Sequence, residues 1–144
     1  MDATYVASVV SKGGRTGHVR SSDGYIDLDV RVPTELGGPG GATNPEELFA
    51  AGYASCFLSA LALMAGKREI DTSEATVEAD VGLDVPGGFT LKVELVVRLP
   101  GVERAMAEKL VARAHEVCPY SRATRGNIDV QLTVAEPAVV ARKD

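Results

Sequence analysis

The amino-acid sequence predicts an α+β fold in which β-strands surround one long buried helix. Apolar and polar residues alternate near both ends of the chain, as they do in half-buried strands. Between these segments lies a long run of small and apolar residues, and an amphipathic segment follows later. The chain has 144 residues, the usual size of one globular domain. We therefore expect residues 1–144 to form a single domain.

The first elements are expected to be the strands of a β-meander. Apolar and polar side chains alternate over Tyr5–Val10 and again over Tyr25–Val32. Ser22-Asp23-Gly24 supplies a turn signal between segments. The glycine-rich stretch 36–41 comes next, where neither a helix nor a strand is favoured. This stretch should be a loop.

The long central helix is expected to span residues 45–65. Asn44 is a suitable N-cap, proline suits the first helical position, and Glu47 completes a capping-box pattern. Neither the face that carries Cys56 nor the opposite face is rich in charge, which predicts a helix buried on most sides. Small residues near Cys56, Gly52 among them, leave room for another backbone to approach closely, which predicts tight packing around the thiol.

The second half of the chain predicts a hairpin, a helix and a last strand. Residues 75–85 and 89–99 alternate in polarity, and Pro86-Gly87-Gly88 joins them as a turn. An amphipathic helix is expected from about Val102 until the residue before Pro119. Residues 128–134 should form the last strand, and the final ten residues a loose tail.

The charge balance argues against several classes of partner. With 15 lysines and arginines against 20 aspartates and glutamates, the net charge is -5. Proteins that bind nucleic acids or anionic membranes gain affinity from an excess of positive charge, which this chain lacks. We therefore expect neither nucleic acid nor a membrane surface as a partner.

The chain is expected to work in the reducing cytoplasm. The longest apolar run, 49–64, is rich in small residues and interrupted, which is not typical of a transmembrane span. The first residues carry neither the basic region nor the apolar region of a signal peptide. In a reducing compartment two cysteines are either core thiols or a catalytic pair, not a structural bridge.

The two cysteines suggest thiol redox chemistry when they are considered together. Cys56 alone, in the middle of a buried helix, would be an inert small apolar residue about as readily as a reactive one. Cys118 lies directly before Pro119, at a junction where a side chain can face another element. If the sulfurs meet, a peroxidase cycle becomes possible: one thiolate attacks a peroxide, and the resulting sulfenic acid condenses with the other thiol.

Other chemistries of these residues fit less well. A structural zinc needs three or four ligands, and the chain offers only Cys56, Cys118, His18 and His115, without close paired spacing. A hydrolase in which His115 is the base for a nucleophilic cysteine is disfavoured, because a helical histidine on a mixed face is more often solvated. No Cys-x-x-Cys motif indicates a thioredoxin-type site.

Two long motifs give the sequence a resemblance to a known family. ATNPEELFAAGYASCF at residues 42–57 and VCPYS at residues 117–121, followed by ATRGNIDV at 123–130, carry the two cysteines. They closely resemble the cysteine motifs of the organic hydroperoxide resistance proteins, within the osmotically inducible protein (OsmC) superfamily. Gly13-Gly14-Arg15 and Glu35-Leu36-Gly37-Gly38 resemble the family's N-terminal half.

The resemblance implies a fold, an activity and a set of site residues. It implies OsmC-like α+β subunits that interlock as a homodimer and reduce organic and fatty-acid hydroperoxides. It implies no bound cofactor, with electrons supplied by dihydrolipoamide or a lipoylated protein. Cys56 would be the peroxidatic cysteine, Cys118 the resolving cysteine, and Arg15 and Glu46 the charged pair. Arg122 stands where the family more often has asparagine.

The charged pair has a physical rationale. A buried thiol stays protonated at neutral pH unless a cation compensates the thiolate for its lost hydration. Arg15 would supply that cation, and Glu46 would hold the guanidinium in place. Glu46 and Cys56 are about 15 Å apart along a straight helix, so one guanidinium cannot touch both. Either the helix breaks near Gly52, or the pair reaches Cys56 from the partner subunit, which we favour.

Three aromatic residues are candidate walls of an apolar substrate pocket: Phe49, Tyr53 and Tyr120. Aromatic residues at helical spacing are more often core packing than ligand contacts. The competing hypothesis for the whole chain is a non-catalytic redox sensor or an apolar-ligand binder on the same scaffold. Turnover of peroxide would separate the two.

Overall fold

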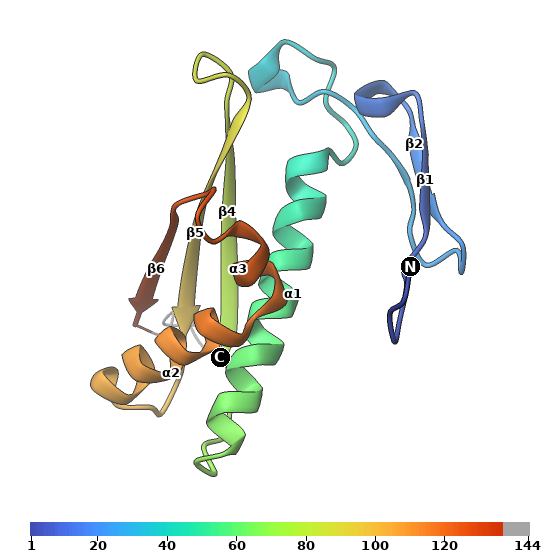
Figure 1. Cartoon of the computed structure of the whole chain (residues 1–144). Helices are drawn as coiled ribbons and strands as arrows, with labels where there is room; N and C mark the ends of the chain where they lie inside the picture. Colours follow the sequence, from blue (N-terminus) through green and yellow to red (C-terminus); the bar gives the residue numbers. More distant parts are fainter. Residues whose placement is uncertain (137–144) are drawn as a thin grey trace, which may run out of the picture. The chain divides into compact units, whose positions relative to one another are not determined.

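The computed structural model describes residues 1–136. The chain divides into two compact units, of which the first is Met1–Leu48 and the second begins at Phe49. The predicted C-terminal tail falls mostly on 137–144, outside the described residues. Figure 1 labels the elements along the chain.

The first unit contains a three-stranded antiparallel meander. Its strands are β1 (Val9–Lys12), β2 (His18–Ser21) and β3 (Asp27–Asp29), in that spatial order. A meander was predicted, but its strands have other bounds. The first strand begins at Val9 instead of Tyr5 and runs to Lys12, and the second predicted segment is reduced to Asp27–Asp29. The middle strand β2 was not predicted. The alternating pattern indicates a strand with one face suited to burial. Within this unit, however, the remaining residues of the two predicted strands have no partner strand.

The first unit has almost no core of its own. Val30 is the single buried side chain among residues 1–48. Apolar side chains of the meander and its flanks are instead exposed: Tyr5, Val6, Val9, Val10, Tyr25, Ile26 and Leu28. A two- or three-stranded sheet without a covered face is at best marginally stable alone.

The long helix α1 (Pro45–Gly66) is continuous over 22 residues and ends within one residue of the prediction. The backbone N–H of Glu47 donates to Asn44 Oδ1 at 2.9 Å, so Asn44 is the N-cap. Of the two hydrogen bonds of the predicted capping box, only this one is formed; the Glu47 side chain does not bond back to the backbone N–H of Asn44. The Glu47 carboxylate accepts from the Thr43 hydroxyl at 2.8 Å instead.

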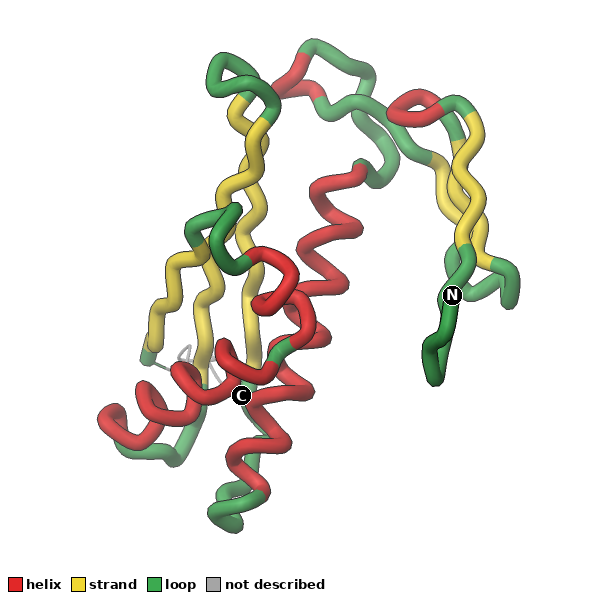
Figure 2. The backbone as a smooth tube through the Cα atoms, viewed as in Figure 1, coloured by secondary structure: helices red, strands yellow, loops and turns green. Residues whose placement is uncertain are grey.

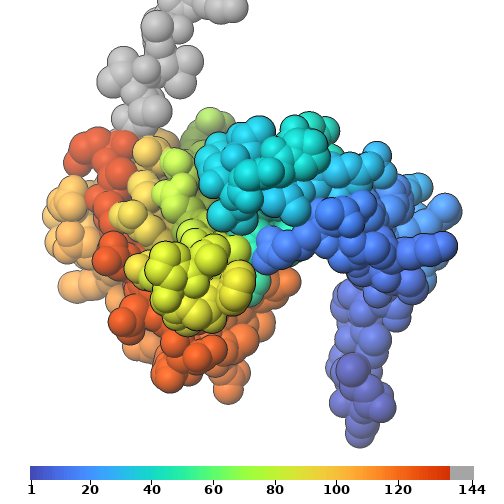
Figure 3. Space-filling view, turned by 90° about the horizontal axis from the view of Figure 1, so that it is seen from above, coloured from blue at the N-terminus to red at the C-terminus, as the bar shows by residue number. Residues whose placement is uncertain are grey.

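The second unit is built on a mixed three-stranded sheet. Strands β4 (Thr76–Asp84) and β5 (Thr90–Arg98) form the predicted antiparallel hairpin. Strand β6 (Val130–Ala135) pairs with β5 in parallel and begins two residues later than predicted. Figure 3 shows the turn between β4 and β5 at the surface, where the Phe89 side chain is exposed. A parallel pair needs a crossover connection, and the helices between β5 and β6 supply it.

Two helices make this crossover, although one was predicted. Helix α2 (Arg104–Val117) begins two residues later than predicted, because the Glu103 carboxylate caps its first turn. Helix α3 (Pro119–Thr124) was missed. Pro119 ends α2, as expected, but it also occupies the first turn of α3, a position that proline favours.

The core of the second unit lies between one face of the sheet and the helices (Figures 1 and 2). It is formed by buried side chains of α1, β5 and α2: Tyr53, Phe57, Leu61, Met64, Val93, Leu95, Val97, Leu110, Val111 and Ala114. The prediction that α1 is buried on most sides is wrong for the chain alone. One face of α1 is exposed and carries mainly small residues: Ala51, Ser55, Ser59, Ala62 and Leu63.

Helix α1 is the one helix of the described chain that is long and apolar enough to cross a membrane, with a mean hydropathy of 1.8. The small residues within this apolar run do not break the helix, which is continuous. Core helices of soluble proteins have the same length and composition. Phe57, Leu61 and Ala65 of α1 are completely buried within the protein, as expected for a core helix.

Candidate active site

The structure brings the two thiols together. Cys118 Sγ lies 3.6 Å from Cys56 Sγ, and both cysteines are free. Cys56 is partly buried on α1, whereas Cys118 is completely buried between α2 and α3. A disulfide has an S–S length of about 2.05 Å. The sulfurs therefore need to approach by only a small movement to form a bond.

The break between α2 and α3 positions Cys118. Its backbone N–H donates to Ala114 O at 2.8 Å, and its carbonyl accepts from the N–H of Arg122 at 2.9 Å. Cys118 is thus the C-cap of α2 and the N-cap of α3 at once, with extended backbone angles. Pro119 prevents the continuation of α2, so the chain turns there and the side chain of Cys118 faces α1.

The surroundings of Cys56 within this unit disfavour its thiolate. Burial raises the pKa of the Cys56 thiol, the backbone N–H of Tyr120 lowers it, and Cys118 raises it further. The net direction is upward. Because the thiolate is the nucleophile in thiol chemistry, Cys56 needs a cation before it can react readily at neutral pH.

The close packing predicted around Cys56 is present at Gly52. A Cβ atom at this position would lie 2.8 Å from Tyr120 Oη and 3.0 Å from Tyr120 Cε2. Because Gly52 has no side chain, the ring of Tyr120 packs directly against the backbone of α1, one turn before Cys56. The predicted neighbour was a backbone, but a side chain fills the space.

We expect Gly52→Val to destabilise the protein by about 1–3 kcal/mol, because the new side chain overlaps the ring of Tyr120. The measurement is urea unfolding. Ala112→Val is the control, since Ala112 is exposed on α2 and only a few tenths of a kcal/mol of helix propensity should be lost there. Equal stability of Gly52→Val and wild type would contradict this packing.

The three predicted pocket residues form one aromatic cluster. Ring centroids are 6.1 Å apart for Phe49 and Tyr53, 6.3 Å for Phe49 and Tyr120, and 5.8 Å for Tyr53 and Tyr120. Tyr53 is completely buried, whereas 40% of Tyr120 is exposed. The accessible part of the cluster is therefore formed by Tyr120 and the partly buried Phe49.

A buried polar network next to the thiols was not predicted. The hydroxyl of Tyr53 lies 2.9 Å from Ser121 Oγ, and His115 Nδ1 lies 2.8 Å from the same oxygen. His115 is partly buried rather than solvated, and its pKa is lowered by burial and by the charge of Arg125. Ser121 belongs to α3, so missing that helix also hid the network.

Arg15 is held by a loop that requires glycine. It lies in a short 3-10 helix (Gly14–Thr16) after Gly13, whose φ of 81° is in the left-handed region that glycine favours. A Cβ atom on Gly17 would lie 1.7 Å from the carbonyl oxygen of Lys12. No other residue fits there without a change of backbone, which explains the glycines on both sides of Arg15.

Arg15 and Glu46 form the predicted ion pair within the first unit. The guanidinium donates through both terminal nitrogens to the two carboxylate oxygens, at 2.9 and 2.6 Å. The hydrogen bond from Arg15 lowers the pKa of Glu46, and Glu46 raises that of Arg15. This two-point contact fixes the orientation of the guanidinium plane.

One of the two arrangements considered for the charged pair is excluded. The helix does not break between Glu46 and Cys56, because α1 is continuous. Ten helical residues span about 15 Å. Glu46 and Cys56 of the same helix are therefore too far apart for one guanidinium to touch both.

Comparisons with known proteins identify the family of this chain. Residues 38–133 match the profile of the family described as OsmC-like protein. The chain belongs to the OsmC-like family. Within this family it is 48% identical over 134 residues to the organic hydroperoxide resistance protein of Xanthomonas axonopodis pv. citri (strain 306), covering 91% of this chain and 94% of that protein. The resemblance inferred from the sequence is confirmed.

Solved structures confirm the α+β OsmC-like fold. A crystal structure of an organic hydroperoxide resistance protein from Legionella pneumophila is 48% identical, with a TM-score of 0.87 over 93% of this chain and 99% of that one. The structure of OhrB from Bacillus subtilis is 44% identical, with a TM-score of 0.84 over 92% of this chain and 100% of that one.

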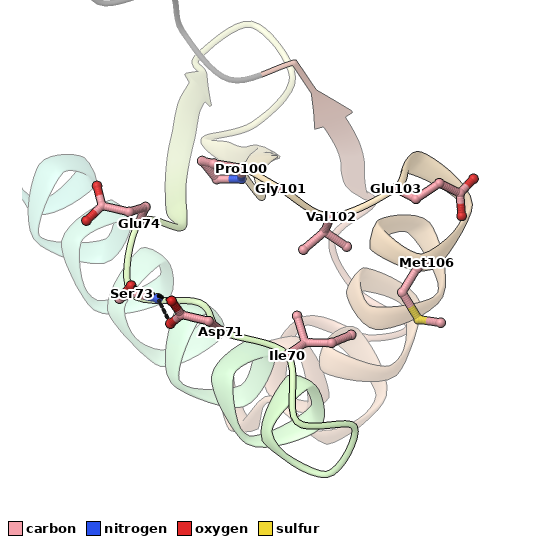
Figure 4. A pocket seen from close by; sticks show the side chains of 9 residues that line it. All are labelled: Ile70, Asp71, Ser73, Glu74, Pro100, Gly101, Val102, Glu103 and Met106. Atoms are coloured by element: carbon pink, nitrogen blue, oxygen red, sulfur yellow. Dashed lines mark hydrogen bonds between the residues drawn. The ribbon is translucent and has the colours of Figure 1, made fainter.

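The second unit of this OsmC-like protein also has a cavity of about 640 Å³ that contains no thiol. Figure 4 shows its walls, which come from the loop after α1 and from the loop that leads into α2. Asp71 accepts hydrogen bonds from Ser73, and Glu103 caps α2. The Asp71 and Glu103 carboxylates lining the cavity are therefore already engaged in hydrogen bonds to neighbouring residues. Over residues 1–136, no group of three or more His, Cys, Asp or Glu side chains is placed to hold a metal ion.

Proposed function

We propose that this protein is a thiol-dependent peroxidase that reduces organic hydroperoxides, including those of fatty acids, to alcohols. The observation that carries the proposal is the approach of the Cys56 and Cys118 sulfurs to 3.6 Å in an unoxidised pair. The identity to organic hydroperoxide resistance proteins over nearly the whole chain supports the choice of substrate.

The first step is the attack of the Cys56 thiolate on a peroxide oxygen. The sulfur–oxygen bond forms as the oxygen–oxygen bond breaks, the sulfur is oxidised to sulfenic acid, and the alkoxide leaves and takes up a proton to become the alcohol. Cys56 suits this role because its side chain is only partly buried. Cys118 is completely buried and suits the second step better.

The second and third steps return the enzyme to its dithiol form. Cys118 attacks the sulfenic sulfur of Cys56, which gives a disulfide and releases water. A dihydrolipoyl dithiol, free or on a lipoylated protein, then exchanges with this disulfide and is itself oxidised to a cyclic disulfide. Two thiols and an external dithiol are sufficient, so the cycle needs no bound cofactor.

The cation for the first step comes from Arg15 of the partner subunit. The Cys56 thiol has a raised pKa in its own unit, so thiolate formation requires a positive charge. Glu46 orients the guanidinium through its two hydrogen bonds and stays away from the sulfur, where a second negative charge would raise the pKa of Cys56 still further.

Two exposed surfaces support a homodimer. The first unit leaves the apolar side chains of its meander open, and the small-residue face of α1 is open as well. A second copy that covers both surfaces would give the meander the core that it lacks, and small residues would let two helices approach closely. We propose an interlocked dimer in the cytoplasm, where thiols remain reduced between turnovers.

The aromatic cluster accounts for a preference for organic peroxides. Phe49 and Tyr120 offer apolar surface close to Cys56 to an alkyl or acyl chain, whereas hydrogen peroxide has no apolar part to bury there. The ring of Tyr53 backs this surface from the core.

The proposal is tested by steady-state consumption of tert-butyl hydroperoxide and of a fatty-acid hydroperoxide with dihydrolipoamide as reductant. We expect many turnovers per chain and a lower kcat/KM for hydrogen peroxide. Oxidation of only one equivalent per chain, with no turnover by any dithiol, would contradict an enzyme and favour a redox sensor on the same scaffold.

A further inference from the structure

The corner between α2 and α3 is closed by hydrogen bonds on both sides of Cys118. His115 in the last turn of α2 and Ser121 in the first turn of α3 are joined by the 2.8 Å contact between Nδ1 and Oγ. Arg125, at the end of α3, donates from its guanidinium to the carbonyl oxygen of His115 at 2.8 Å. These two bonds tie the residues that precede Cys118 to the residues that follow it.

The same corner is tied to the helix that carries the other thiol. Tyr53 lies three residues before Cys56 on α1, and its hydroxyl is 2.9 Å from Ser121 Oγ. Ser121 and Tyr53 are both completely buried. The hydroxyl of Ser121 therefore joins α1, α2 and α3. Ser121 follows Cys118 by three residues, just as Tyr53 precedes Cys56 by three.

The hydrogen bonds of this network can all be satisfied in one direction. His115 Nδ1–H donates to Ser121 Oγ at 2.8 Å. The Ser121 hydroxyl donates to Tyr53 Oη at 2.9 Å, and the Tyr53 hydroxyl donates to Thr124 Oγ1 at 3.3 Å. The Thr124 hydroxyl then donates to the carbonyl oxygen of Ser121 at 3.1 Å. Each hydrogen is used once, which assigns the Nδ1-protonated form to His115.

A buried network of this kind holds its members firmly. Removing one hydroxyl leaves the remaining partners unpaired away from water, which costs more than an ordinary surface hydrogen bond. Among residues 1–136, every buried side-chain nitrogen and oxygen has a hydrogen-bond partner. The corner therefore has one preferred position relative to α1.

We propose that Ser121, Tyr53 and His115 are positioning residues that keep the Cys118 thiol close to Cys56 for disulfide formation. This inference rests on the proposed function. In the step concerned, the Cys118 sulfur bonds to the sulfenic sulfur of Cys56, the sulfur–oxygen bond breaks, and the proton of Cys118 leaves with the oxygen as water. A resolving thiol held nearby reacts before a second peroxide can oxidise the sulfenic acid to sulfinic acid.

The first test is the equilibrium of the purified protein with dithiothreitol, measured as the fraction of Cys56–Cys118 disulfide after acid quench. We expect Ser121→Ala and Tyr53→Phe to shift the equilibrium about tenfold towards the dithiol, the effect of one buried hydrogen bond. Without the hydrogen bond, the corner between α2 and α3 gains conformational entropy in the dithiol form. The disulfide still fixes the corner beside α1, so the oxidised form gains less and the dithiol is favoured. Thr76→Val is the matched control, since it removes a hydroxyl that is exposed on β4 and has no part in this network.

The second test is the fraction of Cys56 converted to sulfinic acid by excess tert-butyl hydroperoxide, measured by mass spectrometry. Both variants should show about tenfold more sulfinic acid than wild type. Tyr53→Phe keeps the ring in the core and carries the test if Ser121→Ala does not fold. The inference is overturned if folded Tyr53→Phe has the same fraction of disulfide as wild type at equilibrium with dithiothreitol. A wild type that does not react with the peroxide contradicts the proposed function alone, because the dithiothreitol equilibrium does not depend on it.

Discussion

Replacing Cys56 with serine is expected to abolish the reduction of organic hydroperoxides. A serine hydroxyl stays protonated at neutral pH and lacks the nucleophilicity of a thiolate. The neighbouring Cys118 does not replace it, because Cys118 is completely buried and has no open path to a peroxide in this structure. The measurement is peroxide consumption with dihydrolipoamide, together with the loss of free thiol after one equivalent of peroxide.

Cys118→Ser is the matched control for this prediction. It removes a thiol 3.6 Å away but leaves Cys56 in place, so we expect one turnover that ends in a sulfenic acid, which a trapping reagent detects. Excess peroxide should then drive Cys56 to sulfinic acid. Sustained turnover by Cys56→Ser, or the same behaviour of both variants, would contradict the division of roles between the two cysteines.

Replacing Arg15 with alanine is expected to lower kcat/KM for organic hydroperoxides by about 100-fold, the usual effect of removing one charged or donating group from a transition state. Without a cation the burial of Cys56 keeps its pKa high, so the loss should shrink as the pH is raised and the thiol ionises. The measurement is a pH profile of kcat/KM beside a titration of the Cys56 thiolate by ultraviolet absorbance.

Two further variants define what Arg15 does. Glu46→Gln keeps a hydrogen-bond acceptor for the guanidinium but removes the charge, so we expect a smaller loss than for Arg15→Ala. Arg20→Ala is the control, because Arg20 is an exposed arginine on β2 with only a 3.8 Å contact to Asp27. A Cys56 titration curve that is identical in wild type and Arg15→Ala would show that the arginine does not stabilise the thiolate.

Mixed dimers decide whether the charged pair acts across subunits. A dimer of one Arg15→Ala chain and one Cys56→Ser chain contains one intact site if Arg15 serves the Cys56 of the other subunit, and none if it serves its own. We therefore expect activity to rise well above that of either variant alone when the two are unfolded, mixed and refolded together. Activity that stays at the level of the separate variants would place the pair and the thiol in one chain.

The long helix and the hairpin could be predicted from the sequence because local signals fix them. Asn44 and the proline after it mark the start of α1, and its N-cap hydrogen bond is formed as the pattern predicts. Pro86-Gly87-Gly88 marks the turn between β4 and β5. The two strands pair over the segments on either side of this turn in which polar and apolar residues alternate. Each of these signals lies within a few residues of the feature that it predicts.

The missed features depend on contacts between distant segments. Helix α3 has only six residues, too few for a periodic pattern, and its Pro119 was interpreted only as the end of α2. The network at Ser121 joins residues 68 positions apart in the sequence, so no local pattern reveals it. The N-terminal strands are shorter than predicted because their alternating side chains have no covering surface within their own unit.

The candidate site was predictable as a set of residues but not as a geometry. The two cysteine motifs identify Cys56 and Cys118, yet only the structure gives their 3.6 Å separation and the difference in their burial. Likewise, the resemblance identifies Arg15 and Glu46, and the structure adds their two-point contact. The continuity of α1 then removes the helix break near Gly52 that the sequence left open.

The most direct test of the proposed cycle is to treat the reduced wild-type protein with one equivalent of an organic hydroperoxide and to measure its intact mass, its free thiols and the alcohol released. The cycle predicts one alcohol per chain, the loss of both thiols and a mass lower by two hydrogens, which corresponds to a Cys56–Cys118 disulfide. Retention of both thiols, or a stable oxygen adduct on Cys56 with Cys118 still free, would contradict it.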